Sequence, residues 1–502
     1  AQAGPGPVLV LAGPGTGKTH TLMGRIAHLM DKSVSPRRIL AVTFTRKAAE
    51  EMGQRLIRHF GDQSSIPRAD TLHALAFEYW AKAYDEAPVI LNEEGARRAF
   101  LEANSGPGSP PAKRLRAIWE RMSYHRETMG RDITEEERQD QETVESFHRY
   151  VKHKESWNLS DYTDLLEFWL EQIQSRIYLC PFTHVLVDEV QDLSPLQLEV
   201  IHELVGAKRH GDAADLEQAR KKGQGGEGFF AIGDPKQSIY GFRGAVRDVQ
   251  ATLQAYWPNL EAVGLSSNYR SHQNLLDLSE HLLPSEHERL KANMEGKCVV
   301  RLFEATTAAS EAAWIGDHCR RLLGSTSHSL SDQESFGEEL SPEEAALQGH
   351  VSPGDIAILI RFKALAKPIA RTLARLGIPC SIPEDEAFWS DPRVALILDT
   401  AGAFHGISPG FTPPEEQNGA EEEDESTGLS IPDKILLKGP MGLSAYLQDM
   451  PPFDRLFWQS REFKALVKAY EEHGGWLGLL NWVHLKHNVE MVRRRSESIQ
   501  II

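Results

Sequence analysis

One short segment near the start of the chain, Val8–His20, restricts the fold more than any other. It begins with the apolar, β-branched run Val8–Leu11, which predicts a buried strand. A loop with three glycines follows, then Lys18 and Thr19, and then apolar residues at helical spacing, which are Leu22, Ile26 and Leu29. A strand, a glycine-rich loop, a Lys-Thr pair and a helix in this order are typical of a phosphate-binding loop.

This loop has the residue types that polyphosphate binding requires. Glycines allow backbone N–H groups to turn towards an anion at a helix N-terminus, where the helix dipole also favours negative charge. We expect Lys18 to contact the β- and γ-phosphates of ATP and the Thr19 hydroxyl to hold Mg²⁺. A simple glycine-rich turn is the alternative, and the strand and helix on either side argue against it. The residues expected around the phosphates are Ala12, Gly13, Pro14, Gly15, Thr16, Gly17, Lys18 and Thr19.

Length and composition indicate a multidomain protein. A chain of 502 residues is too long for one hydrophobic core, so several domains are expected. The chain has no run of about eighteen apolar residues, so we expect no membrane span. Its four cysteines lie far apart and fit neither a disulfide framework nor a zinc site, which favours a reducing, cytoplasmic location.

The net charge of −17 at first argues against a nucleic-acid partner. Thirteen of the acidic residues, however, lie in two base-free tracts, 332–344 and 415–425, which read as loops. Most of the excess negative charge is therefore local, and net charge does not exclude DNA binding.

A second part of a nucleotide site follows the apolar strand Val185–Val187. Asp188 and Glu189 come directly after it, where Asp188 would bind Mg²⁺ and Glu189 would take a proton from the attacking water. Such an acidic pair is common after strands, but together with a phosphate-binding loop it indicates a functional pair. Gln237 lies just past another apolar strand, Phe229–Ile232, where its amide could sense the γ-phosphate.

Two aromatic side chains and a cation, Tyr240, Phe242 and Arg243, lie close together in the sequence. This grouping is typical of sites that stack the bases of single-stranded nucleic acid. The alternative is that the aromatic rings belong to the core, and their spacing does not decide between the two.

The rest of the chain reads as further α/β structure with helical segments. Residues 84–176 are charged and periodic, which predicts a helical insertion without a strand of its own, after a turn-like stretch at Gly61–Arg68. In the second half, two strands flank a helix, so a parallel sheet is expected. The elements expected there are strands at Val299–Phe303, Ile356–Ile360 and Ile378–Ile382, helices at Ala312–Leu323, Leu365–Leu376 and 441–495, and a strand that starts at Ile499.

Six short motifs occur in the order typical of superfamily 1 DNA helicases. They are Ala12–Thr19, Thr43-Phe44-Thr45, Thr71-Leu72-His73, Asp188-Glu189-Val190-Gln191-Asp192, Gly233-Asp234-Pro235-Lys236-Gln237-Ser238-Ile239-Tyr240 and Asn268-Tyr269-Arg270-Ser271. The chain most resembles the UvrD/Rep/PcrA group over nearly its whole length, and Pro235-Lys236 and Phe242 are similar to its RecB/AddA relatives. The resemblance implies an α/β fold of two RecA-like P-loop domains with parallel sheets, each carrying a mainly helical insertion.

The resemblance also implies roles for individual residues. Gln237 would couple ATP to DNA, Tyr269 would stack on the adenine, and Arg270 would reach the γ-phosphate from the second domain. The residues expected to take part in hydrolysis are Lys18, Glu189, Gln237 and Arg270, and the expected Mg²⁺ ligands are Thr19 and Asp188. The side chains expected along the DNA path are Phe44, His73, Tyr240, Phe242 and Arg243.

The same resemblance gives a domain map. The expected parts are 1–83 and 177–265 for the first RecA-like domain, 84–176 for its helical insertion, 266–403 for the first part of the second RecA-like domain, 404–495 for a helical insertion with an acidic loop, and 496–502 for the start of the remainder. The motif Thr-x-His-x-x-Lys-Gly expected after Ile502 and a glutamine motif before the loop are not found. We therefore expect a piece of a helicase, cut at both ends and weakly active or inactive by itself.

The function implied is an ATP-dependent DNA helicase or translocase. It would move 3′→5′ on single-stranded DNA in repair, replication or recombination, with other repair or recombination proteins as partners. A P-loop ATPase switch that does not touch DNA is one alternative, and the Tyr240–Arg243 group argues against it. A non-catalytic DNA-binding arm of a recombination complex is another, and the intact Lys18, Asp188 and Glu189 argue against that.

Overall fold

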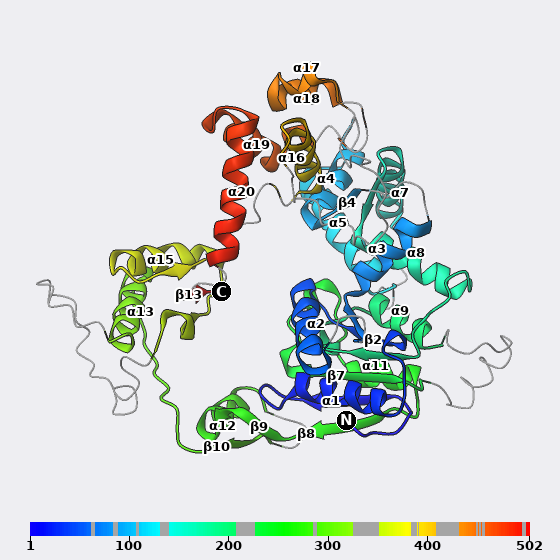
Figure 1. Ribbon diagram of the computed structural model, residues 1–502, viewed down its shortest axis with the longest axis vertical. Helices are drawn as coiled ribbons and strands as arrows, with labels where there is room; N and C mark the ends of the chain where they lie inside the picture. Colours follow the sequence, from blue (N-terminus) through cyan, green and yellow to red (C-terminus); the bar gives the residue numbers. More distant parts are fainter. Residues whose placement is uncertain are drawn as a thin grey trace, which may run out of the picture. The chain divides into compact units, whose positions relative to one another are not determined.

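The computed structural model forms two compact units, Ala1–Gly296 with Met450–Leu456 and Lys297–Asp449 with Phe457–Ile502 (Figure 1). Each unit is described by itself. The structure describes all residues of the chain except 62–65, 84–88, 107–109, 131–139, 207–225, 285–288, 325–350, 383–388, 390, 408–430, 448–449, 451–452, 454–456 and 494–497.

The first unit is built around a parallel sheet whose strands follow the order β3-β2-β6-β7-β1-β8. The inner strands are apolar at nearly every position because helices cover both faces of the sheet. Odd and even residues therefore point into two different cores. The strands are β1 (Val8–Ala12), β2 (Ile39–Val42), β3 (Arg68–Asp70), β6 (His184–Val187), β7 (Phe229–Gly233) and β8 (Glu261–Leu265).

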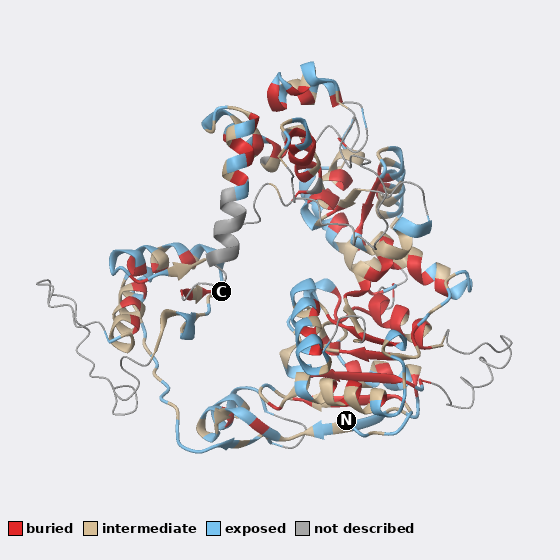
Figure 2. Cartoon of the chain, in the orientation of Figure 1, coloured by how far each residue is buried: buried red, intermediate tan, exposed pale blue. Residues whose placement is uncertain are grey.

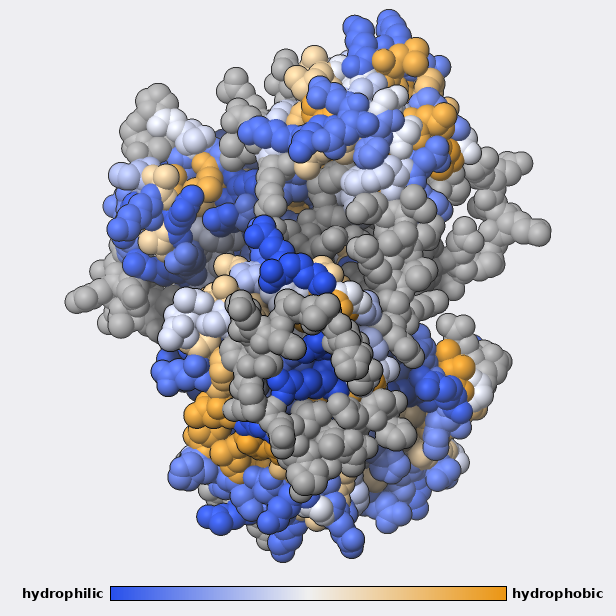
Figure 3. All heavy atoms as spheres, turned by 90° about the vertical axis from the view of Figure 1, so that its left-hand side faces the viewer, coloured by the Kyte–Doolittle hydropathy of each residue, from blue (hydrophilic) through white to orange (hydrophobic). Residues whose placement is uncertain are grey.

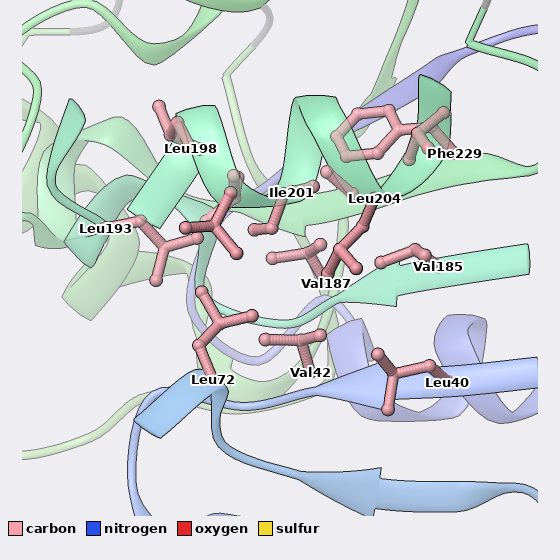
Figure 4. Packing of buried hydrophobic residues seen from close by; sticks show 14 of the residues in the cluster. Leu40, Val42, Leu72, Val185, Val187, Leu193, Leu198, Ile201, Leu204 and Phe229 are labelled. Atoms are coloured by element: carbon pink, nitrogen blue, oxygen red, sulfur yellow. The ribbon is translucent and has the colours of Figure 1, made fainter. Parts of the chain in front are cut away.

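Two hydrophobic clusters hold this sheet in place. On one face, Leu40, Val42, Val185 and Val187 pack against helix residues such as Ile201, as Figure 4 shows. The opposite face packs against α1 and α2, and the strands are the most completely buried part of the unit (Figure 2). The helices of the two layers are α1 (Lys18–Asp31) and α2 (Arg46–Phe60), and α3 (Leu72–Ala83), α8 (Tyr162–Gln174), α9 (Pro195–Gly206) and α11 (Val249–Tyr256).

The α/β class and the predicted strands Val8–Leu11, Val185–Val187 and Phe229–Ile232 of this sheet are confirmed. The edge strand β3 was not expected, because the preceding stretch reads as a turn. Its three residues, Arg68–Asp70, are only half-buried and carry little apolar surface. Parallel pairing with β2, with Leu40 opposite Arg68, makes them a strand. The pairing lies in the tertiary structure and leaves no apolar pattern in the segment itself.

Residues 89–161 include a helical subdomain with its own core. The expectation that residues 84–176 contain no strand is wrong, since β4 (Val89–Leu91) and β5 (Leu159–Asp161) form a short parallel pair. Two strands of three residues are too short to show alternation in the sequence. The helices of the subdomain are α4 (Glu93–Ala103), α5 (Ala112–Glu127) and α7 (Gln141–Ser156).

A group of buried charges ties this subdomain together. Arg126 Nη1 lies 2.9 Å from Asp161 Oδ2, and Lys154 Nζ lies 2.8 Å from the same oxygen. Burial raises the pKa of Asp161, but the charges of Arg126 and Lys154 lower it by more. The pKa of Asp161 therefore lies below its usual range. Tyr150 donates its hydroxyl proton to Asp161 as well, at 2.8 Å. The carboxylate therefore stays charged in the interior because the side chains of Arg126, Lys154 and Tyr150 donate to it.

A short strand pair completes the first unit. β9 (Ser267–His272) and β10 (Lys291–Met294) are parallel and are connected through α12 (Gln273–Leu282). The expected second RecA-like domain begins at residue 266, whereas the compact unit extends to Gly296. β9 therefore lies in the same unit as the phosphate-binding loop. The domain boundaries of the sequence analysis remain predictions.

The second unit contains a smaller parallel sheet with the order β11-β13-β12. The predicted strand–helix–strand unit is confirmed by β11 (Ala357–Ile358), α15 (Ala366–Arg375) and β12 (Cys380–Ser381). The expected strand at the end is also present, and it lies between the other two as β13 (Ile499–Ile501). Together with α13 (Ala308–Leu322), these elements enclose a core around Leu373 and Ile501.

The strand expected at Val299–Phe303 is wrong. These residues are described and form no strand, and the side chain of Leu302 is almost fully exposed. No neighbouring strand pairs with them among the described residues, although Phe303 stacks on Trp314 with ring centroids 4.7 Å apart. The prediction of a strand rested on the apolar run alone, and these residues pair with no described strand of the sheet.

The remaining described part of the second unit is helical, as expected. Trp476 is buried and donates its indole N–H to Leu436 O, at 2.7 Å. The acidic tracts 332–344 and 415–425 lie outside the described residues. The helices are α16 (Pro392–Phe404), α17 (Asp433–Leu436), α18 (Gly439–Leu447), α19 (Arg461–Glu472) and α20 (Trp476–Arg493).

The surface is mixed in character. On the face drawn in Figure 3, hydrophilic side chains surround separate smaller apolar patches. Among the described residues, no helix is both long enough and apolar enough to cross a membrane.

Candidate functional site

The phosphate-binding loop connects β1 to α1. Ala12 is the buried last residue of β1, and Gly15 and Gly17 have positive φ angles of 70° and 87°, which a residue with a Cβ adopts only under strain. Thr16 donates its hydroxyl proton to Gly13 O, at 2.7 Å, and so closes the turn. In the described part of the chain, no side chain caps the start of α1. The N–H groups of its first turn thus face the loop that an anion would enter.

Lys18 brings the ends of three strands together. Its Nζ lies 2.7 Å from Glu189 Oε2, just past β6, and 3.2 Å from Gln237 Oε1, just past β7. The strands β6, β7 and β1 are neighbours in the sheet, so their carboxyl ends lie along one edge. Two predicted nucleotide-site residues, which lie 171 and 219 positions from Lys18 in the sequence, thus contact this lysine directly.

The paired carboxylates follow β6 in a tight turn. Glu189 has a positive φ of 48°, and its backbone N–H donates to Asp188 Oδ1, at 3.0 Å. A non-glycine residue in this left-handed conformation is uncommon and is typical of functional sites. The turn directs the Glu189 carboxylate to Lys18.

Gln191 is a contact that the sequence analysis missed. It is buried, its Nε2 donates to Glu189 Oε2, at 2.9 Å, and its Oε1 accepts the backbone N–H of Asp234, at 3.0 Å. A Cβ on Gly233 would collide with this side chain, which explains the glycine there. Gln191 thus links the carboxylate after β6 to the loop after β7. Its position inside the Asp188–Asp192 motif was the only indication in the sequence.

Burial changes the acidity of this edge of the sheet. Burial raises the pKa of Asp188 to about 6, and the neighbouring charge of Glu189 adds to the shift. The same two causes raise the pKa of Asp192 to about 6, and burial also raises the pKa of Asp234. Three acidic groups therefore sit where a nearby cation would favour their charged forms.

Thr19 and Asp188 provide the kind of oxygen atoms that Mg²⁺ prefers. Thr19 is the second residue of α1, and Asp188 directly follows β6. A divalent cation would offset the cost of keeping Asp188 charged beside Glu189, so this pair fits such an ion.

The strand β9 lies against the phosphate-binding loop. The backbone N–H of Tyr269 donates to Gly15 O, at 2.9 Å, and the buried Asn268 donates through Nδ2 to Pro14 O, at 2.5 Å. Tyr269 and Arg270 are both exposed beside this contact. The structure thus brings the predicted adenine and γ-phosphate residues next to the loop that carries Lys18.

A second cluster contains four of the predicted DNA-path residues. The ring centroids of Phe44 and Tyr240 are 4.8 Å apart, and those of Tyr240 and Phe242 are 6.2 Å apart. The guanidinium of Arg243 lies 5.8 Å from the Tyr240 ring and 5.7 Å from the Phe242 ring, and it also pairs with Glu93 at 3.0 Å. Phe242 is 74% exposed, so it does not belong to a core.

His73 occupies different surroundings. It lies in the first turn of α3, where its ring packs edge-on against Tyr162 with centroids 5.4 Å apart. Burial lowers the pKa of His73 to about 4, and Arg46 contributes a smaller part of the shift. Among the described residues, the ring contact of His73 is with Tyr162, rather than with the aromatic cluster of Phe44, Tyr240 and Phe242.

Fold and site together define the class of protein. A parallel α/β sheet carries a phosphate-binding loop whose lysine meets a carboxylate and a glutamine from neighbouring strand ends, as in P-loop nucleotide-binding proteins. A family model for the UvrD/REP helicase N-terminal domain matches residues 1–255, and one for the UvrD-like helicase C-terminal domain matches residues 263–400. The chain belongs to the UvrD/REP helicase family.

Curated relatives agree with this assignment. The chain is 27% identical over 418 residues to the ATP-dependent DNA helicase PcrA of Leuconostoc citreum, an alignment that covers 79% of this chain and 50% of the relative. It is 25% identical over 409 residues to the ATP-dependent DNA helicase srs2 of Schizosaccharomyces pombe, covering 74% and 41%, respectively. It is 27% identical over 428 residues to PcrA of Staphylococcus aureus, covering 78% and 51%. The chain therefore spans about half the length of the relatives it matches.

Proposed function

We propose that this chain is the ATP-driven motor part of a DNA helicase that moves 3′→5′ on single-stranded DNA. The observation that carries the proposal is the convergence of Lys18, Glu189 and Gln237 at one edge of the sheet. Family membership adds the DNA substrate, since the matched relatives are named ATP-dependent DNA helicases. Direction of movement and preference for single strands rest on the resemblance.

In this proposal, the nucleotide site works by exchange of partners around Lys18. The β- and γ-phosphates of ATP take the place of the Glu189 carboxylate at the ammonium group, since both are anions that compete for one cation. Glu189 is then free to accept a proton from the attacking water, while Gln191 still donates a hydrogen bond to Glu189 Oε2. Gln237 also lies beside the Lys18 ammonium group and contacts the γ-phosphate. Mg²⁺, held by Thr19 and Asp188, would neutralise phosphate charge.

Tyr269 and Arg270 complete the nucleotide site from β9. We infer that the exposed Tyr269 ring stacks on the adenine and that the Arg270 guanidinium contacts the γ-phosphate, where it stabilises charge that develops during transfer. Both residues lie beside the loop of Pro14 and Gly15.

The aromatic cluster would hold the DNA. Phe242 and Tyr240 offer ring faces on which bases stack irrespective of sequence, and Arg243 adds positive charge beside them. Phe44 packs against Tyr240 from the segment between β2 and α2. Thr45, the next residue, caps α2. The proposed pathway is DNA repair, replication or recombination, together with partner proteins of such a pathway.

The test is ATP hydrolysis by the chain in Mg²⁺ buffer, with and without an excess of single-stranded DNA. If the chain is a motor, DNA raises the rate of ATP hydrolysis. The decisive quantity is the ratio of the rates with and without DNA, rather than the size of either rate. A P-loop switch predicts hydrolysis that DNA does not change, and a non-catalytic arm predicts DNA binding without ATP binding. Strand displacement from duplexes that carry a 3′ or a 5′ single-stranded tail then tests the direction, and unwinding from the 5′ tail would contradict it.

A further inference from the structure

Asn268 makes an unusual set of hydrogen bonds at the start of the arginine-bearing segment. Its side chain is completely buried, although it is polar. Nδ2 donates to Pro14 O, at 2.5 Å, and Oδ1 accepts the backbone N–H groups of Arg270 and Ser271, at 2.9 and 2.8 Å. One side chain thus fixes the backbone that carries Arg270 and also binds the phosphate loop.

The loop has a matching surface at Gly15. Its carbonyl accepts the N–H of Tyr269, at 2.9 Å, and its φ of 70° suits glycine. A Cβ on Gly15 would lie 2.6 Å from Arg270 Cβ and 2.8 Å from Asn268 Nδ2. Only a residue without a side chain allows β9 to approach this closely. Gly15 therefore serves both the turn of the loop and its contact with β9.

We propose that Asn268 is a positioning residue that fastens the strand bearing Tyr269 and Arg270 to the phosphate-binding loop. It would act on nucleotide binding through Arg270, by holding the backbone of that residue beside the loop of Pro14 and Gly15. The role in nucleotide binding rests on the proposed function. The existence of the fastening itself does not, because it can be measured without nucleotide.

The two ends of the Asn268 side chain can be separated by substitution. Asn268→Asp keeps an oxygen that accepts from Arg270 and Ser271, but it replaces the donor to Pro14 O by a second acceptor. The turn is retained and the bond to the loop is lost. Asn293→Ala is the matched control, since Asn293 Nδ2 donates to the main-chain O of Asn268, at 3.3 Å, and leaves the Asn268 side chain untouched.

The first experiment measures hydrogen exchange at the Tyr269 amide without nucleotide. Because this amide donates to Gly15 O, we expect slow exchange in the wild type and in N293A, and roughly five- to tenfold faster exchange in N268D, the size expected from the loss of about one hydrogen bond. Exchange of Tyr269 at the wild-type rate in N268D would overturn the proposal.

The second experiment is a double-mutant cycle on the affinity for fluorescently labelled ATP with Mg²⁺. N268D is expected to weaken binding about three- to tenfold, and R270A about ten- to a hundredfold, since a bond to a charged group is lost. In the R270A background, N268D should add less than about twofold, because its effect passes through Arg270. Equal effects of N268D in both backgrounds contradict that route.

Two further observations keep the outcome clear. If the far-UV spectrum shows that N268D does not fold, G15A tests the same contact from the loop, and its Tyr269 amide should also exchange faster. An unchanged rate in G15A overturns the fastening. A wild-type chain that does not bind ATP overturns the proposed function and the nucleotide role of Asn268, while the exchange of Tyr269 still decides whether β9 is fastened to the loop.

Discussion

Lys18 and Glu189 form an ion pair, and in the proposed function Lys18 binds the nucleotide while Glu189 accepts the proton of the attacking water. Lys18→Ala should abolish ATP binding, because it removes the only lysine in the loop. Glu189→Gln should bind ATP at least as tightly as the wild type, since an amide competes less well than a carboxylate for the Lys18 ammonium at 2.7 Å. Hydrolysis should fall by about 10²–10⁴, since the amide cannot accept the proton of water. Equilibrium binding measures the effect on ATP affinity, and single-turnover hydrolysis measures the effect on the rate. Normal hydrolysis by E189Q would exclude Glu189 as the base.

The half-buried ring of Tyr240 and the exposed ring of Phe242 should contribute to DNA binding alone. Replacing each by Ala should weaken binding of single-stranded DNA by about 1–3 kcal/mol per ring, with little dependence on sequence. ATP affinity should not change, since these rings contact each other, Phe44 and Arg243 rather than Lys18 or Glu189. A fluorescence titration at constant salt measures the loss. Phe100→Ala, which removes a buried ring of the helical subdomain, separates this effect from general destabilisation.

His73 makes stability depend on pH in a predictable direction. Its pKa is lowered from 6.5 to about 4 in the folded chain, so the unfolded chain takes up the proton first as the pH falls. The stability conferred by neutral His73 is therefore complete above pH 6.5 and is lost progressively between 6.5 and 4. His73→Phe keeps a ring against Tyr162 and cannot titrate. Melting temperatures at about pH 7 and pH 5 should differ less in H73F than in the wild type, and equal differences would contradict this assignment.

Residues whose role follows from local chemistry could be predicted, and residues that act through tertiary contacts could not. The strand, turn and helix around Lys18 and the loop glycines predict a phosphate-binding loop from a few residues, and the structure has these elements there. Gln191 and Asn268 lie inside motifs that the sequence analysis quoted, but their hydrogen bonds reach Asp234 and Pro14, which are far away in the sequence. No pattern along the chain shows such partners.

At the scale of elements, the buried charges at the end of α5 join α5 and β5 of the helical subdomain to α8. Arg126 on α5 faces Asp161 at the end of β5, and Asp164 and Glu167 on α8. Arg126→Met should destabilise the subdomain by about 3–5 kcal/mol, because buried carboxylates lose a partner. Arg114→Met breaks pairs with Asp140 and Glu142 at the surface and should leave the unfolding midpoint nearly unchanged. Urea unfolding compares the two, and equal shifts would show that burial is not what matters.

Three of the strands that the sequence analysis missed share one physical property. β3, β4 and β5 have three residues each, and each becomes a strand only because a partner pairs with it. The opposite error occurred at Val299–Phe303, where apolar residues have no partner strand among those described. The long, fully buried strands of the first unit were predicted correctly, since burial on both faces requires an apolar residue at each position.

For the whole molecule, the two units should lose stability independently. Leu373 and Leu204 are both completely buried, the first in the core of the second unit and the second in the core of the first. Leu373→Ala and Leu204→Ala should each cost about 2–5 kcal/mol, each in its own unit. Hydrogen exchange measured peptide by peptide in increasing urea shows in which unit each variant loses stability. ATP affinity should persist in L373A, since Lys18, Glu189, Gln237 and Asn268 all belong to the first unit. A drop in protection throughout both units would show one cooperative structure instead.

The position of β13 in the sheet of the second unit determines the order in which that sheet can be assembled during synthesis. β11 and β12 do not pair with each other, and each pairs with β13. In the first unit, β2 can pair with β3 soon after both leave the ribosome, whereas β1 must wait for its neighbours β7 and β8. In the second unit, β11 and β12 emerge early and must keep their edges unpaired while α16 to α20 are made. Nascent chains should therefore depend on holding chaperones during this interval, and strand edges that wait unpaired are where aggregation would begin.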